Sequence, residues 1–125
     1  MHYNLLGNTG LRVSSLSFGA SSLSAVFHPV KESDAIAAVH AALDTGINYF
    51  DVAPAYGGTR SESILGKALK GIARNRYYIS TKVGKYTDPL VYGKDELDFS
   101  SKQIRQSLEE SAERLGTDYF DIIHL

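Results

Sequence analysis

Short apolar segments with strand character alternate with amphipathic helical segments along most of this chain, and this alternation constrains the fold more than any other feature. Strands are expected at residues 16–20, 47–51, 78–82 and 118–125, and helices at residues 32–45, 61–69 and 100–115. Strands that alternate with helices predict a parallel sheet with right-handed crossover connections. We therefore expect an α/β fold.

A β-hairpin is expected ahead of the first of these strands, with apolar Leu5–Leu6 and Leu11–Val13 on either side of the turn Gly7–Gly10. An open dinucleotide-binding sheet is the rival fold, but Phe18–Ser22 carries no Gly-x-Gly-x-x-Gly phosphate turn. A (β/α)8 barrel needs about 250 residues. The 125 residues are therefore expected to form one domain, the N-terminal half of a TIM barrel. Because Leu125 falls within a predicted strand, we expect the chain to be a fragment of a longer protein.

Ordinary capping signals set the expected helix ends. Ser61 and Ser100 are the predicted N-caps, Ser100 in a Ser-x-x-Gln capping pattern, and Gly46 and Gly116 are the predicted C-terminal stops. The side chains expected to face inward are, helix by helix, Ile36, Val39 and Leu43; Ile64, Leu65, Ala68 and Leu69; and Ile104, Leu108, Ala112 and Leu115.

Composition excludes several classes of partner. Fourteen acidic and thirteen basic residues leave a formal net charge of −1, so nothing favours nucleic acid or an anionic membrane surface. No apolar run approaches the roughly 20 residues that span a bilayer, and the N-terminus lacks the pattern of a signal peptide. The chain has no cysteine, and its histidines show no ligand spacing, so no metal site is predicted. A cytoplasmic location is expected.

The candidate chemistry lies where two predicted strands end. Asp51 closes one strand, Tyr56 follows in a turn-rich loop, and Lys82 closes the next strand. Parallel strands deliver these groups to the same edge of the sheet. A nearby carboxylate stabilises a charged lysine, and a lysine close to a tyrosine favours the phenolate. The phenol then becomes a usable general acid and base near neutral pH.

These residues lie in motifs that resemble the aldo-keto reductase family. The motifs are Leu16–Ala20, Asn48–Gly57, Ser61–Gly66 and Ile79–Val83. The resemblance runs from Leu5 to the last residue of the chain. The Gly-Gly-Thr-Arg-Ser-Glu loop and Val83–Tyr86 are most similar to the sugar-oxidising branch, that of L-galactose dehydrogenase and the aldose 1-dehydrogenases.

The resemblance implies an oxidoreductase that transfers hydride between NADP or NAD and a small carbonyl or sugar substrate. Tyr56 would exchange the proton with the substrate oxygen, Lys82 would favour its ionisation, and Asp51 would hold Lys82 charged and in place. The positions that match the family's cofactor-binding residues are Gly19, Ala20, Ser21 and Asp51.

The family's fourth catalytic residue is a histidine, which would occupy position 126, five residues after Asp121. His124 lies on the same strand face by alternation, and we expect it to be a packed interior histidine rather than a catalytic one. Without position 126 and the second half of the barrel, the 125-residue segment is expected to be inactive alone.

Other segments have more than one interpretation. The loop from Gly84 to Phe99 is long for a connection of this type. Its residues Lys85, Tyr86 and Tyr92 could contact a polyol substrate, or the loop could be ordinary irregular surface. Glu62 either suits the first turn of its helix through the helix dipole or has a functional role.

Two alternative functions remain open. The same fold serves as a non-catalytic cytoplasmic β-subunit of potassium channels, whose members carry asparagine at the position equivalent to 126. A free-standing half-barrel that dimerises as a scaffold is the other. Taken singly, Asp51, Tyr56 and Lys82 could be a turn residue, loop cover and a solvated lysine. Their joint placement favours the chemical interpretation.

Overall fold

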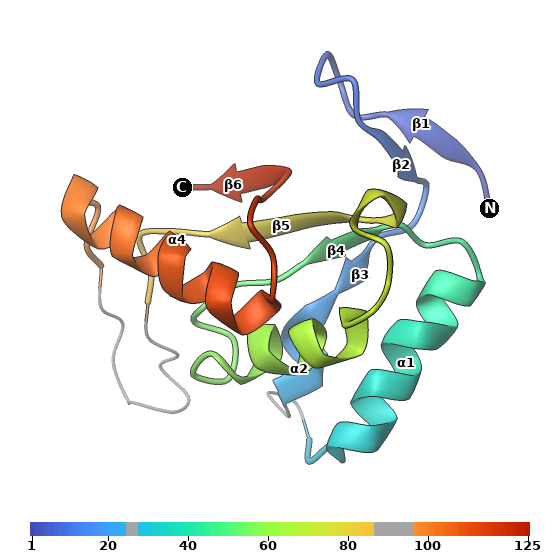
Figure 1. The fold of residues 1–125 in the computed structure, drawn as a ribbon, viewed down its shortest axis with the longest axis horizontal. Helices are drawn as coiled ribbons and strands as arrows, with labels where there is room; N and C mark the ends of the chain where they lie inside the picture. The colour runs from blue at the N-terminus through green and yellow to red at the C-terminus, as the bar shows by residue number, and fades with distance from the viewer. Residues whose placement is uncertain (25–27, 87–96) are drawn as a thin grey trace.

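The computed structural model describes residues 1–24, 28–86 and 97–125, which form a small hairpin beside a four-stranded parallel sheet (Figure 1). Antiparallel strands β1 (Tyr3–Leu5) and β2 (Arg12–Ser14) form the hairpin. The parallel sheet has the order β3 (Phe18–Gly19), β4 (Tyr49–Asp51), β5 (Tyr78–Lys82) and β6 (Ile122–His124). Both the predicted hairpin and the predicted parallel sheet are confirmed.

Helical segments connect consecutive strands of the parallel sheet. Helices α1 (Glu32–Asp44), α2 (Arg60–Leu69) and α4 (Ser101–Leu115) lie on one side of the sheet in Figure 1. The short 3-10 helices η1 (Ala20–Ser24) and η2 (Arg74–Arg76) follow β3 and precede β5. Among the described residues, no helix has the length and apolar character needed to cross a membrane.

Helix α4 begins and ends at its predicted capping residues. The Gln103 N–H donates to Ser100 Oγ at 3.3 Å, and Gly116 ends the helix with φ of 65°. Asp98 adds a second contact, because its Oδ1 accepts the Ser100 N–H at 2.8 Å. This backbone hydrogen bond stabilises the carboxylate and lowers the pKa of Asp98.

Helix α2 starts one residue earlier than predicted, and Ser61 is not its N-cap. The N-cap is Thr59, which has a left-handed φ of 72° after Gly57 and Gly58, each with φ of 58°. This tight turn places Ser61 inside the first helical turn. There it is fully buried, and its hydroxyl has no hydrogen-bond partner among the described residues. The glycine-rich turn, rather than a serine cap, fixes the start of α2.

The core lies between the helices and one side of the parallel sheet. Phe50 of β4 and Ile79 of β5 are paired in register and buried against Val39 of α1 and Ile64 and Leu65 of α2. Burying a large apolar side chain stabilises a fold by about 1.5–3 kcal/mol. The predicted inward face of α2 is confirmed, because all of its members are buried.

The buried line on α1 is shifted from the predicted one. Ala35, Val39 and Ala42 are buried, whereas Ile36 and Leu43 are only partly buried and pack at the margin of the core. Only Val39 belongs both to the predicted stripe and to the buried line.

The buried line on α4 also differs from the prediction. It consists of Ser107, Ser111 and Leu115, while Ile104, Leu108 and Ala112 are only partly buried. Helix α4 approaches α2 very closely at Gly66, where an added Cβ would lie 2.2 Å from the Arg114 carbonyl oxygen. The missing side chain of Gly66 leaves space for this close approach of the α4 backbone.

Three predicted strands are shorter in the structure, and β4 begins at Tyr49 rather than at residue 47. Strand β3 begins at Phe18, and Leu16 is 63% exposed rather than buried. Strand β6 begins at Ile122, just after residues that Arg74 binds. The Arg74 guanidinium donates to Tyr119 O at 3.1 Å and to Asp121 Oδ2 at 2.7 Å. Asp121 Oδ2 also accepts the Ile79 N–H at 2.8 Å. No local sequence pattern predicted this clamp, which joins the start of β6 to β5.

Candidate active site

Asp51 and Lys82 form an ion pair at the carboxyl ends of adjacent strands. Lys82 Nζ lies 2.5 Å from Asp51 Oδ1 and also donates to Val52 O at 3.3 Å. Ser80, in register with Asp51, donates its hydroxyl to the same Oδ1 at 2.6 Å. The two charged side chains remain 29% and 30% exposed. The pair is therefore fixed in place but still open to solvent.

Tyr56 joins this pair from the loop that follows β4. Lys82 Nζ lies 5.5 Å from the centroid of the Tyr56 ring, within the range of cation–π attraction. The ring is partly buried against the core, and Tyr56 O accepts the Ser61 N–H at 3.3 Å, which ties the loop to the first turn of α2. The structure thus brings Asp51, Tyr56 and Lys82 together, as their positions at strand ends predict.

His124 lies on the same face of the sheet as the ion pair. It is in register with Lys82, and its Nε2 lies 3.8 Å from Asp51 Oδ1. The side chain lies on the predicted face and is 47% exposed among the described residues. Its packing in the interior of a complete barrel stays a prediction. His124 helps to line an open hollow of about 500 Å³, together with Ser17, Gly19, Tyr49, Asp51 and Lys82.

The residues predicted to bind a cofactor differ in their access to this hollow. Gly19 lines it, and no atom lies within 4 Å of where a Cβ would stand, so a ligand could approach the backbone there. Ser21 is partly buried at the start of η1. The methyl group of Ala20 is fully buried in the core, so Ala20 can offer only its backbone. The open strand end at Gly19 fits the close approach that a bound dinucleotide requires.

The predicted substrate residues lie in the loop after β5. Tyr86 is partly buried, and its hydroxyl is buried with no hydrogen-bond partner in the described part of the chain. Lys85 is exposed and forms an isolated antiparallel bridge with Leu97. Tyr92 lies outside the described residues. The polyol-binding role of this loop therefore stays a prediction.

Glu62 lies in the first turn of α2 and is a buried carboxylate with both oxygens bound. It is fully buried, with Oε1 accepting the Thr81 hydroxyl at 2.8 Å and Oε2 lying 2.7 Å from Arg114 Nε. Arg114 is 52 residues away in the chain, so no local pattern could identify it as the partner. The contact joins the first turn of α2 to β5 and to the end of α4.

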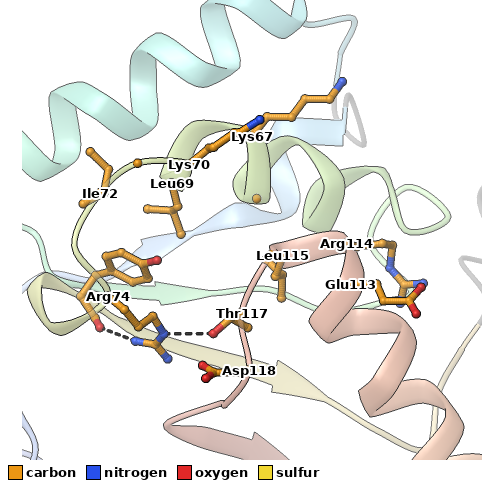
Figure 2. A pocket seen from close by; sticks show the side chains of 14 residues that line it. Lys67, Leu69, Lys70, Ile72, Arg74, Glu113, Arg114, Leu115, Thr117 and Asp118 are labelled. Carbon is orange, nitrogen blue, oxygen red and sulfur yellow. Dashed lines mark hydrogen bonds between the residues drawn. The ribbon is translucent and has the colours of Figure 1, made fainter.

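A second hollow lies at the other end of the sheet, where α2 and α4 end, and has a volume of about 480 Å³ (Figure 2). Arg74 in its wall already donates to Thr117 Oγ1 at 3.1 Å and to Tyr77 O at 2.8 Å. Burial also raises the pKa of the Tyr77 hydroxyl, which keeps that group neutral. These groups serve the clamp to β6, so this hollow is a weaker candidate for chemistry.

The sequence has several known relatives. It matches the model of the aldo/keto reductase family over residues 15–125. It is 51% identical over 121 residues to L-galactose dehydrogenase of Arabidopsis thaliana, covering 95% of this chain and 36% of that protein. It is 36% identical over 129 residues to a probable voltage-gated potassium channel subunit beta of Oryza sativa subsp. japonica, covering 99% of this chain and 37% of that protein. The chain thus spans little more than a third of these relatives.

The fold also matches solved structures. An aldo-keto reductase from Bacillus halodurans, described as a holo form, superposes with a TM-score of 0.84 at 36% identity, over 98% of this chain and 39% of that one. This match confirms the predicted fold class, an α/β segment of a TIM barrel preceded by a β-hairpin. With the family model matching from Ser15 to Leu125, the chain belongs to the aldo/keto reductase family.

Proposed function

We propose that the protein containing this chain is an NAD(P)-dependent oxidoreductase that interconverts a sugar, or another small carbonyl compound, and its alcohol or lactone. The observation that carries the proposal is the position of Lys82 Nζ, 2.5 Å from Asp51 and 5.5 Å from the Tyr56 ring. A sugar substrate is supported by the 51% identity to L-galactose dehydrogenase.

In this proposal each group of the site has one task. A bound nicotinamide supplies or accepts the hydride, and Gly19, Ser21 and the Ala20 backbone at the strand end would hold the cofactor. The Tyr56 hydroxyl gives its proton to the substrate oxygen during reduction and removes it during oxidation. The Lys82 ammonium stabilises negative charge on that hydroxyl, and Asp51 keeps Lys82 charged and in place.

Residues 1–125 are proposed to be the N-terminal half of one barrel in the complete protein. The shares of the relatives that the chain covers, 36% to 39%, support this division. The N-terminal half carries Asp51, Tyr56 and Lys82, and the other half would complete the cofactor site. The cofactor is NADP or NAD, since the groups that would distinguish them lie outside the described residues.

A non-catalytic binding subunit is the second candidate function. It is favoured by the 36% identity to a probable channel β-subunit. The chain is similar to relatives of both kinds, so the two functions must be separated by activity. A binding subunit of this type would turn over sugars and aldehydes slowly or not at all.

Replacement of Tyr56 by phenylalanine tests the proposed function. Tyr56→Phe removes only the hydroxyl, so we expect cofactor binding to persist and turnover to fall by about 10²–10⁴. Turnover is measured on the complete protein by the change in nicotinamide absorbance with L-galactose, other aldoses and small aldehydes. Binding is measured by quenching of protein fluorescence. Wild-type turnover in Tyr56→Phe would contradict the assignment.

A further inference from the structure

We infer that His124 is a positioning residue for the Asp51–Lys82 pair, and that Lys82 keeps its place only while the imidazole is neutral. This inference rests on the proposed function, because its consequence is read from the reaction. It assigns a task to a side chain that the sequence alone places only in the barrel interior.

The first step of the argument is the contact pattern of Asp51. Lys82 Nζ at 2.5 Å, Ser80 Oγ at 2.6 Å and His124 Nε2 at 3.8 Å all approach the same oxygen, Oδ1. No contact to Oδ2 is recorded among the described residues. One carboxylate oxygen therefore serves a hydroxyl, an ammonium and an imidazole, and a gain by one of them is a loss for another.

The second step is the register of the strands. His124 on β6 pairs with Lys82 on β5, so the imidazole and the ammonium lie side by side on one face of the sheet. The titratable groups that face His124 from the neighbouring strands are Asp51 and Tyr49 of β4 and Lys82 of β5, all in the wall of the same hollow. Asp51 is the one carboxylate among these three groups, so a second cation beside Lys82 would share it.

The third step is the chemistry of the imidazole. Histidine is the side chain that ordinarily changes charge between about pH 5 and 8. When neutral, the ring can donate one N–H toward Asp51 and leaves Lys82 as the cation of the pair. When protonated, it repels the adjacent ammonium and competes for Oδ1. Lys82 then moves away from Asp51. Because its ammonium is the cation next to the Tyr56 ring, Tyr56 loses that neighbour.

The consequence is an acid limb in the pH dependence of the reaction. Wild-type kcat should fall on acidification, because a charged imidazole displaces Lys82 from its place near the Tyr56 ring. A displacement of about 1 Å can cost as much as 10²-fold in rate. A histidine that only fills space would leave the pH profile unchanged when it is replaced.

The test compares His124→Gln with His124→Leu in the complete protein. Glutamine can donate to Asp51 but never becomes charged, so His124→Gln should retain the alkaline rate within about threefold and lose the acid limb. Leucine can make neither contact, so His124→Leu should lower kcat at every pH, with a smaller effect on KM. The matched control is His40→Gln, since among the described residues the His40 ring has one hydrogen-bond partner, Ala68 O, at 2.8 Å on the helix side. This control should keep the wild-type profile.

The outcomes separate this inference from the proposed function. If His124→Gln shows the same acid limb as wild type, or if wild type has no acid limb, His124 does not position the pair. If Tyr56→Phe retains full turnover, the proposed function itself is wrong, whatever the shape of the profile. Melting temperatures of all variants confirm that each is folded before its profile is interpreted.

Discussion

Consecutive residues of strand β5 bind two carboxylates, Glu62 and Asp51, and the two carboxylates lie on opposite faces of the strand. Thr81 faces the helices and donates to Glu62, while Ser80 and Lys82 face the other side and contact Asp51. The side chain of Thr81 and those of Ser80 and Lys82 are separated in this way because neighbouring residues of a strand point to opposite faces. One short strand therefore supports both the packing of the helices and the candidate site.

The two carboxylates differ in burial and in how their oxygens are used. Glu62 has no exposed side-chain surface, and both of its oxygens are bound, one by Thr81 and one by Arg114. Asp51 is 29% exposed, and its recorded contacts fall on one oxygen. A buried and fully bound ion pair can change little without unfolding. A partly open pair can gain or lose a partner without unfolding.

The largest expected effect comes from breaking the buried pair. Arg114→Met leaves the Glu62 carboxylate buried without its cation. Removing one partner of a buried pair typically costs about 3–5 kcal/mol. We expect the free energy of unfolding of the complete protein, measured with denaturant, to fall by an amount of this order.

A double variant separates the loss of the pair from the loss of arginine packing. In Glu62→Gln/Arg114→Met both charges are gone, and the amide can still accept the Thr81 hydroxyl. Replacing both members of a buried pair is often nearly neutral. The double variant should therefore be more stable than Arg114→Met alone. Equal stability of the two would mean that packing, not the unpaired carboxylate, dominates.

Breaking the open pair should have a smaller effect on stability and a larger effect on chemistry. Lys82→Met removes a cation that is 30% exposed from a carboxylate that is 29% exposed. Partly exposed pairs contribute about 1 kcal/mol or less. If Lys82 acts on Tyr56 as proposed, the pH–rate profile for oxidation should nevertheless move toward alkaline pH.

Lys67→Met is the matched control for this variant. Lys67 pairs with Glu32 at 2.8 Å, and both side chains are more exposed than those of the candidate site, at 57% and 44%. Its loss should change the free energy of unfolding by a similar small amount and leave the profile in place. Retained activity with an unchanged profile in Lys82→Met would remove Lys82 from the mechanism.

The comparison also shows what the sequence could and could not predict. The meeting of Asp51 and Lys82 was predictable, because the carboxyl ends of adjacent parallel strands share one edge. The Ser100 cap was predictable because its signals lie within a few residues. The Glu62–Arg114 pair joins residues 52 positions apart and has no periodic pattern, so only the fold reveals it.

The wrong helix predictions have different physical origins. Ser61 has the residue type of an N-cap, but the turn through Gly57, Gly58 and Thr59 starts the helix before it. Of the stripe of α4 that was expected to face inward, only Leu115 is buried, together with two serines of the same helix. Which face of α4 is buried depends on its contact with α2 near Gly66, and this contact has no local sequence signal.

A third carboxylate extends the comparison to full exposure and gives the smallest expected effect. Asp98 is exposed, and the Ser100 N–H that it accepts at 2.8 Å holds its pKa below the ordinary value of 3.8. A carboxyl group whose pKa is lowered by folding adds stability above the unfolded value and loses it as pH falls through the folded value. The advantage of wild type over Asp98→Asn should therefore be constant at neutral pH and vanish on acidification below about pH 4. Urea midpoints of both proteins measured over this range test it, with Asp98→Ala as the control that lacks the hydrogen bond at every pH. An advantage that persists undiminished in acid would show that the amide fails to replace the carboxylate for geometric reasons, and that the charge contributes nothing at this exposed position.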